Sequence, residues 1–65
     1  MMKLYATVRL KEALPEYALQ RGAIGAIVAI FETPSRAYEV EFADAHGRTI
    51  VQVALREEQI EEVPS

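Results

Sequence analysis

The sequence has no cysteine and only one histidine, which excludes a disulfide and a cysteine-ligated metal site. A metal site would have to rest on carboxylates, and we predict neither a bound metal nor a cofactor. The longest apolar run, Gly22–Phe31, is too short to cross a bilayer, which takes about 20 residues. No signal pattern precedes the first alternating segment, and these absences together predict a cytoplasmic protein without membrane contact.

The balance of charge also restricts the classes of function. Ten acidic and seven basic residues give a net charge of −3. Nucleic-acid binding usually depends on clustered lysine and arginine, so this chain is a poor candidate unless its basic groups share one face. Its 65 residues predict a single domain over residues 1–65, and a domain this small gains stability from self-association.

The run Gly22–Phe31 predicts a buried strand around which the other strands are arranged. Its β-branched and aromatic residues disfavour a helix. Gly22 follows a polar pair and is expected to turn the chain at positive φ. Gly25 lies inside the strand, where glycine indicates a bulge, a sharp bend or a close backbone approach. A phosphate-binding glycine loop is disfavoured because the required Lys-Ser/Thr and helix do not follow.

Apolar residues alternate with polar ones in the rest of the chain, which indicates further strands with one buried face. Pro15 suits a helical turn with Leu14 and Leu19 packed beneath it. Asp44–Gly47 has the composition of a hairpin turn. The tail after Arg56 fits a 3-10 turn followed by a short fifth strand. We therefore predict an all-β fold, a small antiparallel barrel of about five strands. The three other full strands are expected at Lys3–Leu10, Ala37–Ala43 and Thr49–Leu55.

The second and fourth strands carry apolar residues on both faces. Polar residues would be expected at Ala23, Ala26 and Ala29, and exposed apolar patches usually mark interfaces. The alternative is that these small alanines are scattered harmlessly and that Phe31 closes a barrel end. An interface predicts an oligomer that Ala29→Glu dissociates. The candidate interface consists of Ala26, Ala29, Phe31, Ile50 and Ala54.

A second candidate surface is basic. Lys3, Arg9 and Lys11 fall on the outer face of the first strand, which is either a solvated face or a small anion-contacting patch. The candidate residues for contact with RNA or another anion are Tyr5, Arg9, Lys11 and Arg21.

The remaining titratable groups favour no catalytic assignment. His46 lies in a predicted turn, where a solvated imidazole is the simpler interpretation than a ligand or general base. Glu39 and Glu41 share a strand face and could share a cation, although such pairs also serve solubility. A barrel filled by its own side chains leaves little room for a sheltered pocket, so we predict that the chain is not an enzyme on its own.

Three segments together resemble a known family. They are Leu4–Glu16, Leu19–Val28 with its Gly-x-x-Gly-x-Ile pattern, and Tyr38–Phe42. The chain resembles a group of short, stand-alone bacterial proteins, frequent in cyanobacteria, known only as a domain of unknown function. The resemblance implies an SH3-like barrel and no activity. The Gly-x-x-Gly-x-Ile segment and the Tyr38–Phe42 strand also resemble the barrel of nitrile hydratase β subunits and, more loosely, the KOW modules of ribosomal and transcription proteins.

These observations lead to three functional hypotheses. The first is a protein-interaction module that self-associates or docks on a partner protein, with an antitoxin- or immunity-like role by analogy. The second is a KOW-like contact with RNA or the ribosome. The third, by analogy with nitrile hydratase, is an accessory subunit of a larger enzyme.

Overall fold

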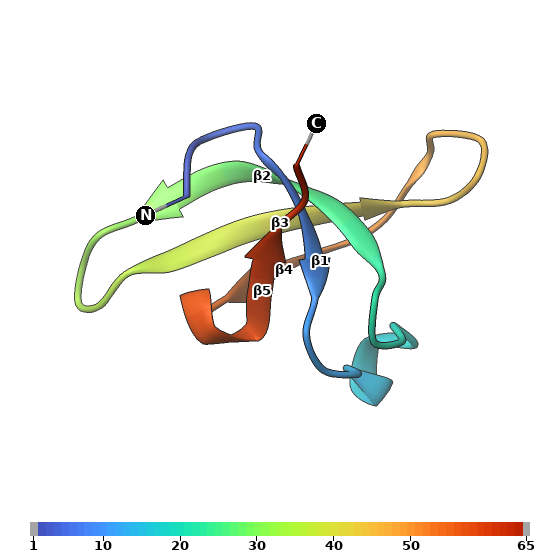
Figure 1. Cartoon of the computed structure of the whole chain (residues 1–65), viewed down its shortest axis with the longest axis horizontal. Helices are drawn as coiled ribbons and strands as arrows, with labels where there is room; N and C mark the ends of the chain where they lie inside the picture. Colours follow the sequence, from blue (N-terminus) through green and yellow to red (C-terminus); the bar gives the residue numbers. More distant parts are fainter. Residues whose placement is uncertain (1, 65) are drawn as a thin grey trace.

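The computed structural model describes residues 2–64, which form one open sheet of five antiparallel strands in the order β4-β3-β2-β1-β5 (Figure 1). Two single 3-10 turns, η1 and η2, are the helical elements of these residues. The prediction of an all-β fold with a short helical turn is therefore confirmed. The elements are β1 Thr7–Leu10, η1 Pro15–Tyr17, β2 Ile24–Phe31, β3 Ala37–Ala43, β4 Thr49–Leu55, η2 Glu57–Gln59 and β5 Ile60–Glu62.

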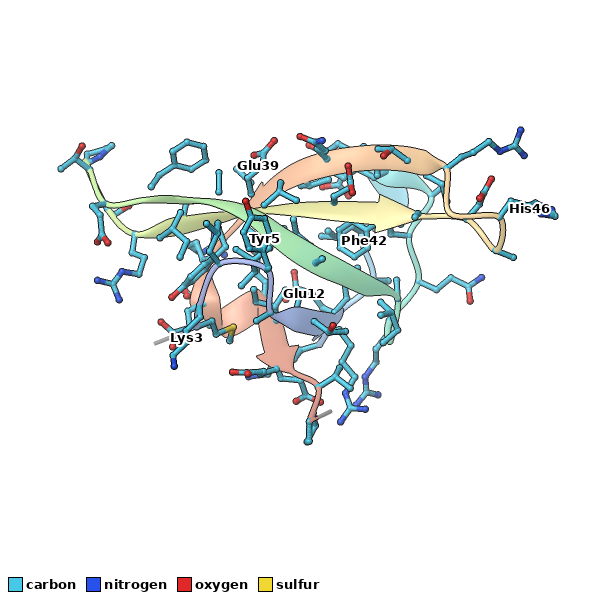
Figure 2. The ribbon with its side chains drawn as sticks, turned by 90° about the horizontal axis from the view of Figure 1, so that it is seen from above. Lys3, Tyr5, Glu12, Glu39, Phe42 and His46 are labelled. Atoms are coloured by element: carbon cyan, nitrogen blue, oxygen red, sulfur yellow. The ribbon has the colours of Figure 1, made fainter. Side chains whose placement is uncertain are left out.

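One face of the curved sheet supplies the core. Strand side chains alternate between faces, and the inward set consists of the apolar residues that the alternation predicted, except that Leu4 is exposed and that Ala6 and Val51 are half-buried. Leu14 and Leu19 pack against this set from either side of η1, as expected. Figure 2 shows Phe42 on the core side of β3 and Glu39 on the opposite side. The buried residues are Val8, Leu10, Leu14, Leu19, Ile27, Tyr38, Val40, Phe42, Val53, Leu55 and Ile60.

Both glycines of the β2 region have the roles that the sequence indicated. Gly22 turns the chain into β2 with a φ of +90°. A Cβ atom on Gly25 would lie 2.8 Å from the carbonyl oxygen of Glu41, so β3 packs against this position as only glycine allows. The irregular register of β2 lies elsewhere, at Val28, between the pairs Ile27–Val40 and Ala29–Glu39. The prediction that β2 is a strand is confirmed, and its bulge is three residues beyond Gly25.

The first strand is shorter than predicted. We expected Lys3–Leu10, but β1 begins at Thr7 because residues before it form a turn, in which the Ala6 N–H donates to the Lys3 carbonyl at 3.1 Å. Tyr5 has a φ of +69° in this turn. Leu4 is consequently exposed and does not join the core face, so the outer-face series of basic residues is not continuous.

The C-terminal half follows the prediction closely. Strands β3 and β4 have the expected bounds, and the turn between them has Gly47 at a φ of +79°. The Asp44 carboxylate closes this turn by accepting hydrogen bonds from the backbone N–H groups of His46 (2.9 Å) and Arg48 (3.0 Å). Turn η2 and strand β5 follow as expected and place Ile60 in the core.

Candidate functional site

The predicted interface residues of β2 lie on the outer face of the sheet. Ala26 is paired with Glu41, and Ala29 is paired with Glu39, although the two alanines are three positions apart. A regular strand would place them on opposite faces. The bulge at Val28 restores them to one face, with Ala54 of β4 on the other side of Glu39. The register therefore brings Ala26, Ala29 and Ala54 to one surface, separated by two glutamates.

The two large apolar residues of the candidate interface are exposed at its margins. Phe31 ends β2 with 46% of its surface exposed, and Ile50 near the start of β4 has 58% exposed. Ala23 is different: it packs against the core, so the expectation that it replaces a polar surface residue is wrong. The reason is that Ala23 precedes β2, where its carbonyl accepts a hydrogen bond from Leu10.

The two glutamates within this surface differ in their partners. Glu41 accepts hydrogen bonds from the Thr49 hydroxyl (2.9 Å) and the Gln52 side-chain amide (3.2 Å). The Glu39 side chain is half-buried between Ala29 and Ala54, and its carboxylate forms no hydrogen bond or ion pair within residues 2–64. The outer face of β2, β3 and β4 is thus apolar at its margins, with one carboxylate in its middle that lacks a partner in the described chain.

The two edges of the sheet have different compositions. Strand β5 has three residues, two of them glutamates, which is a common way to discourage pairing at an edge. Strand β4 has seven residues, Thr-Ile-Val-Gln-Val-Ala-Leu, with no charge and no proline. Within residues 2–64, its second edge forms no backbone ladder. The strand order, which the sequence does not reveal, thus leaves an uncharged strand at one edge.

Three of the four residues of the basic candidate surface surround one groove. Arg9 on β1, Lys11 just after it and Arg21 in the turn before β2 line an open groove of about 380 Å³, together with Leu10, Gly22 and Glu61. The backbone joins these segments, because the Gly22 N–H donates to the Leu10 carbonyl at 2.9 Å. Tyr5 is 73% exposed and does not line the groove, so the fourth predicted residue stands apart.

The charges of this groove are only partly compensated. The Arg9 guanidinium forms an ion pair with Glu61 of the neighbouring strand β5. This hydrogen bond and the Arg9 charge, with smaller effects of Lys11 and Arg21, lower the pKa of Glu61. Lys11 and Arg21 form no ion pair within the described chain. The groove holds three cations and one carboxylate, which is a local surplus of positive charge on an acidic protein.

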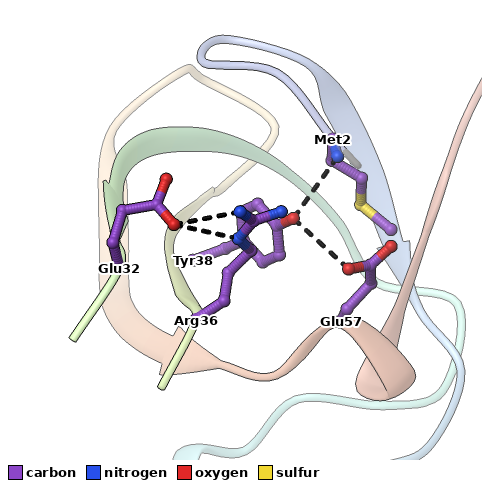
Figure 3. A network of polar contacts seen from close by, with 5 residues as sticks. All are labelled: Met2, Glu32, Arg36, Tyr38 and Glu57. Atoms are coloured by element: carbon purple, nitrogen blue, oxygen red, sulfur yellow. Dashed lines mark hydrogen bonds and ion pairs between the residues drawn. The ribbon is translucent and has the colours of Figure 1, made fainter. Parts of the chain in front are cut away.

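A polar network that the sequence did not indicate lies at the Tyr38 end of the core (Figure 3). The buried Tyr38 hydroxyl accepts from the Met2 N–H at 3.3 Å and donates to Glu57 at 3.5 Å. Arg36 donates two hydrogen bonds to Glu32, and the Glu32 carboxylate, with a smaller effect of Tyr38, raises the pKa of Arg36. The alternation of β3 correctly predicted that Tyr38 is buried, but the sequence did not indicate which groups hydrogen-bond to its hydroxyl.

His46 lies in the turn between β3 and β4, is exposed, and does not line the basic groove (Figure 2). Within residues 2–64, no three histidine, aspartate or glutamate side chains gather closely enough to hold a metal ion. The part of the chain that the structure describes also contains no helix of the length and apolarity needed to cross a membrane.

A comparison with the models of known protein families shows which family the chain belongs to. Residues 4–62 match the family described as "Domain of unknown function (DUF4926)", which covers nearly all of the sequence. The chain belongs to the DUF4926 family. No curated protein and no solved structure matches it. Membership in DUF4926 bears out the resemblance to a domain of unknown function, whereas the likeness to SH3-like, nitrile hydratase and KOW barrels stays a prediction.

Proposed function

We propose that this DUF4926 protein is a non-catalytic interaction module that self-associates by pairing the free edge of β4 with β4 of a second copy. The proposal depends on three features of β4: it has seven residues, it carries no charged side chain, and within residues 2–64 it pairs with β3 alone. An edge of this kind offers a row of backbone donors and acceptors to another strand. Ala54 on the outer face of β4 would extend the contact beyond the backbone.

The sequence of β4 is compatible with pairing to itself. In an antiparallel pair with a two-fold axis at Gln52, Ile50 would lie opposite Ala54, and Val51 would lie opposite Val53. Apolar side chains would therefore meet apolar side chains on either side of a central Gln52–Gln52 pair, with the register irregularity of the β3–β4 pairing located at Ile50. Arg48 and Arg56 would approach each other at the ends, but each already has a carboxylate partner at 3.2 Å and 3.1 Å, respectively.

The expected dimer is weak. Pairing two edges buries less surface than a standard stable interface, so we expect a Kd on the order of 0.1 mM. Sedimentation equilibrium from about 10 µM to 1 mM tests the proposal by giving the mass as a function of concentration. A mass that rises toward that of a dimer supports self-association, and a monomer throughout this range contradicts it.

A matched pair of variants tests whether β4 is responsible. Ile50→Lys places a charge at the exposed start of β4 and should shift the dimer Kd at least tenfold upward. Ile24→Lys makes the same change at a residue that is 51% exposed but belongs to β2, two strands away from the edge. This control should leave the Kd within about twofold. Equal weakening by both variants would assign the contact to another surface.

Docking on a different protein is the second candidate, and it includes the antitoxin-like, immunity-like and accessory-subunit roles. The uncharged edge of β4 could also accept an extended segment of another protein as an added strand. Co-expression with the product of the neighbouring gene tests it directly. A stoichiometric complex that Ile50→Lys disrupts and Ile24→Lys preserves would support this role, and the absence of a complex would remove it.

A further inference from the structure

We propose that the groove formed by Arg9, Lys11 and Arg21 binds the terminal phosphate of a small phosphate monoester. This site lies between β1 and β5, at the side of the sheet opposite β4, and is independent of the proposed self-association. Four segments contribute to it: the end of β1, the residue that follows, the turn before β2 and the middle of β5.

The charge of the groove selects the class of ligand. Three cations and the Glu61 carboxylate leave a surplus of two positive charges. A phosphate monoester carries between one and a half and two negative charges near pH 7, roughly the amount needed to neutralise this surplus. Two guanidinium groups also present the paired N–H donors that match phosphate oxygens in bidentate geometry.

The Glu61 carboxylate would compete with a bound phosphate for the Arg9 guanidinium. This carboxylate forms an ion pair with the Arg9 guanidinium, while Lys11 and Arg21 form no ion pair in the described chain. Lys11 and Arg21 interact with carboxylates only at longer range, Lys11 with Glu58 and Glu61 and Arg21 with Glu61, so a phosphate would contact these two cations first and then compete with Glu61 for Arg9. Removing the Glu61 charge should therefore strengthen binding, which is a result that a purely structural ion pair would not produce.

The arrangement favours a single phosphate over a nucleic-acid backbone. A single strand is usually held by a track of cations accompanied by aromatic side chains on which bases stack. Here the cations converge on one groove, and Tyr5, the aromatic residue of the predicted RNA surface, does not line it. A groove of about 380 Å³ that opens to solvent has room for a phosphate and part of the group attached to it.

Titration with phenyl phosphate, followed by amide ¹H–¹⁵N spectra at constant ionic strength and pH 7.5, tests the proposal. We expect saturable shifts at Leu10, Lys11, Arg21 and Gly22 with a Kd on the order of 1 mM. Lys11→Gln and Arg21→Gln should each weaken binding by about tenfold, and Glu61→Gln should strengthen it by about threefold. Lys3→Gln removes the same charge outside the groove and is the matched control, expected to stay within twofold.

Three results would overturn the phosphate site. The first is the absence of saturable shifts up to about 20 mM phenyl phosphate, relative to sodium chloride of equal ionic strength. The second is equal weakening by Lys3→Gln and Lys11→Gln, which would indicate a diffuse effect of net charge. The third is binding of oligouridylate without a terminal phosphate, with shifts that include Tyr5, while phenyl phosphate has no effect. That result would assign the basic residues to contact with RNA.

Discussion

The three glycines of the chain occupy positions that disfavour any other residue. Gly25 is the clearest case, because a Cβ at this position would lie 2.8 Å from both the Glu41 carbonyl oxygen and a methyl carbon of Val40. The backbone of β3 cannot withdraw without disturbing its own pairing with β4. Gly25 is therefore required by space, whereas Gly22 and Gly47 are required by positive φ.

Substitution of Gly25 by alanine should lower the free energy of unfolding by about 2–4 kcal/mol, since overpacking displaces β3. Gly47→Ala is the matched control: the space around Gly47 is open, so the cost should be limited to the backbone, about 1 kcal/mol. Urea denaturation of both variants measures the difference. Equal costs for the two substitutions would show that the close approach at Gly25 is unimportant.

Asp44 should make the stability depend on pH on the acid side. Backbone N–H groups, that of Arg48 foremost, lower the pKa of Asp44 below its ordinary value of 3.8. The stabilisation is therefore fully present above about pH 4 and is lost as the pH falls through the lower pKa of the folded state. Asp44→Asn should be less stable than the wild type at pH 6.

The difference between the wild type and Asp44→Asn should narrow as the pH falls through the lowered pKa of Asp44, because the carboxyl then becomes protonated in both the folded and the unfolded state. Urea midpoints measured at several pH values between 2 and 7 give this difference. Glu16→Gln in η1 is a control for the loss of one exposed carboxylate. A gap between the wild type and Asp44→Asn that stayed constant across this range would contradict the assigned role of the Asp44 charge.

At the scale of the elements, β5 is the shortest strand and depends on one side chain. Ile60 is 1% exposed and lies next to Leu10 in the β1–β5 register, whereas Glu61 is half-buried and Glu62 is exposed. The strand therefore belongs to the core through Ile60. Its loss would uncover Val8 and Leu10 along β1.

Ile60→Ala should cost about 2–5 kcal/mol, a large part of the roughly 3–10 kcal/mol that a chain of this size has in total. We expect much of the variant to be unfolded at 37 °C, as thermal unfolding followed by circular dichroism would reveal. Glu62→Ala, in the same strand but exposed, should change the midpoint by no more than a few degrees. A stable Ile60→Ala variant would mean that β5 is dispensable.

Sequence patterns predicted the elements with a clear period and missed those determined by the backbone. Strand β3 alternates strictly, β4 has an apolar residue at every second position from Val51 to Leu55, and the bounds of both strands were predicted to the residue. The stretch before β1 alternates equally well but forms a turn, because tertiary hydrogen bonds to β2 override a local pattern. The bulge at Val28, which places Ala26 and Ala29 on one face, leaves no mark in the composition of β2.

The same distinction applies to the candidate sites. Arg9 and Lys11 share a strand face and could be grouped from the sequence, whereas Glu61 reaches them only through the pairing of β1 with β5. Ile50 and Ala54 were predicted to be exposed, but the free edge beside them follows from the strand order. Whether a strand lies at the edge depends on the order of all strands in the sheet, so it cannot be predicted from the residues of that strand alone.

At the scale of the whole molecule, the sheet has one protected edge and one unprotected edge. The acidic residues of β5 discourage pairing on one side, and the groove with its surplus of positive charge lies there too. The other side ends in the uncharged β4. A net charge of −3 is small enough that two copies can approach at physiological salt, where charges more than about 8 Å apart are screened.

The most direct test of the β4 edge is amide hydrogen exchange of the intact protein at about 10 µM and about 1 mM, resolved by residue. We expect those amides of β4 that do not bond to β3 to exchange several-fold more slowly at the higher concentration, while the outer amides of β5 exchange at the same rate at both. Unchanged exchange along the free edge of β4 at both concentrations would contradict strand pairing between copies.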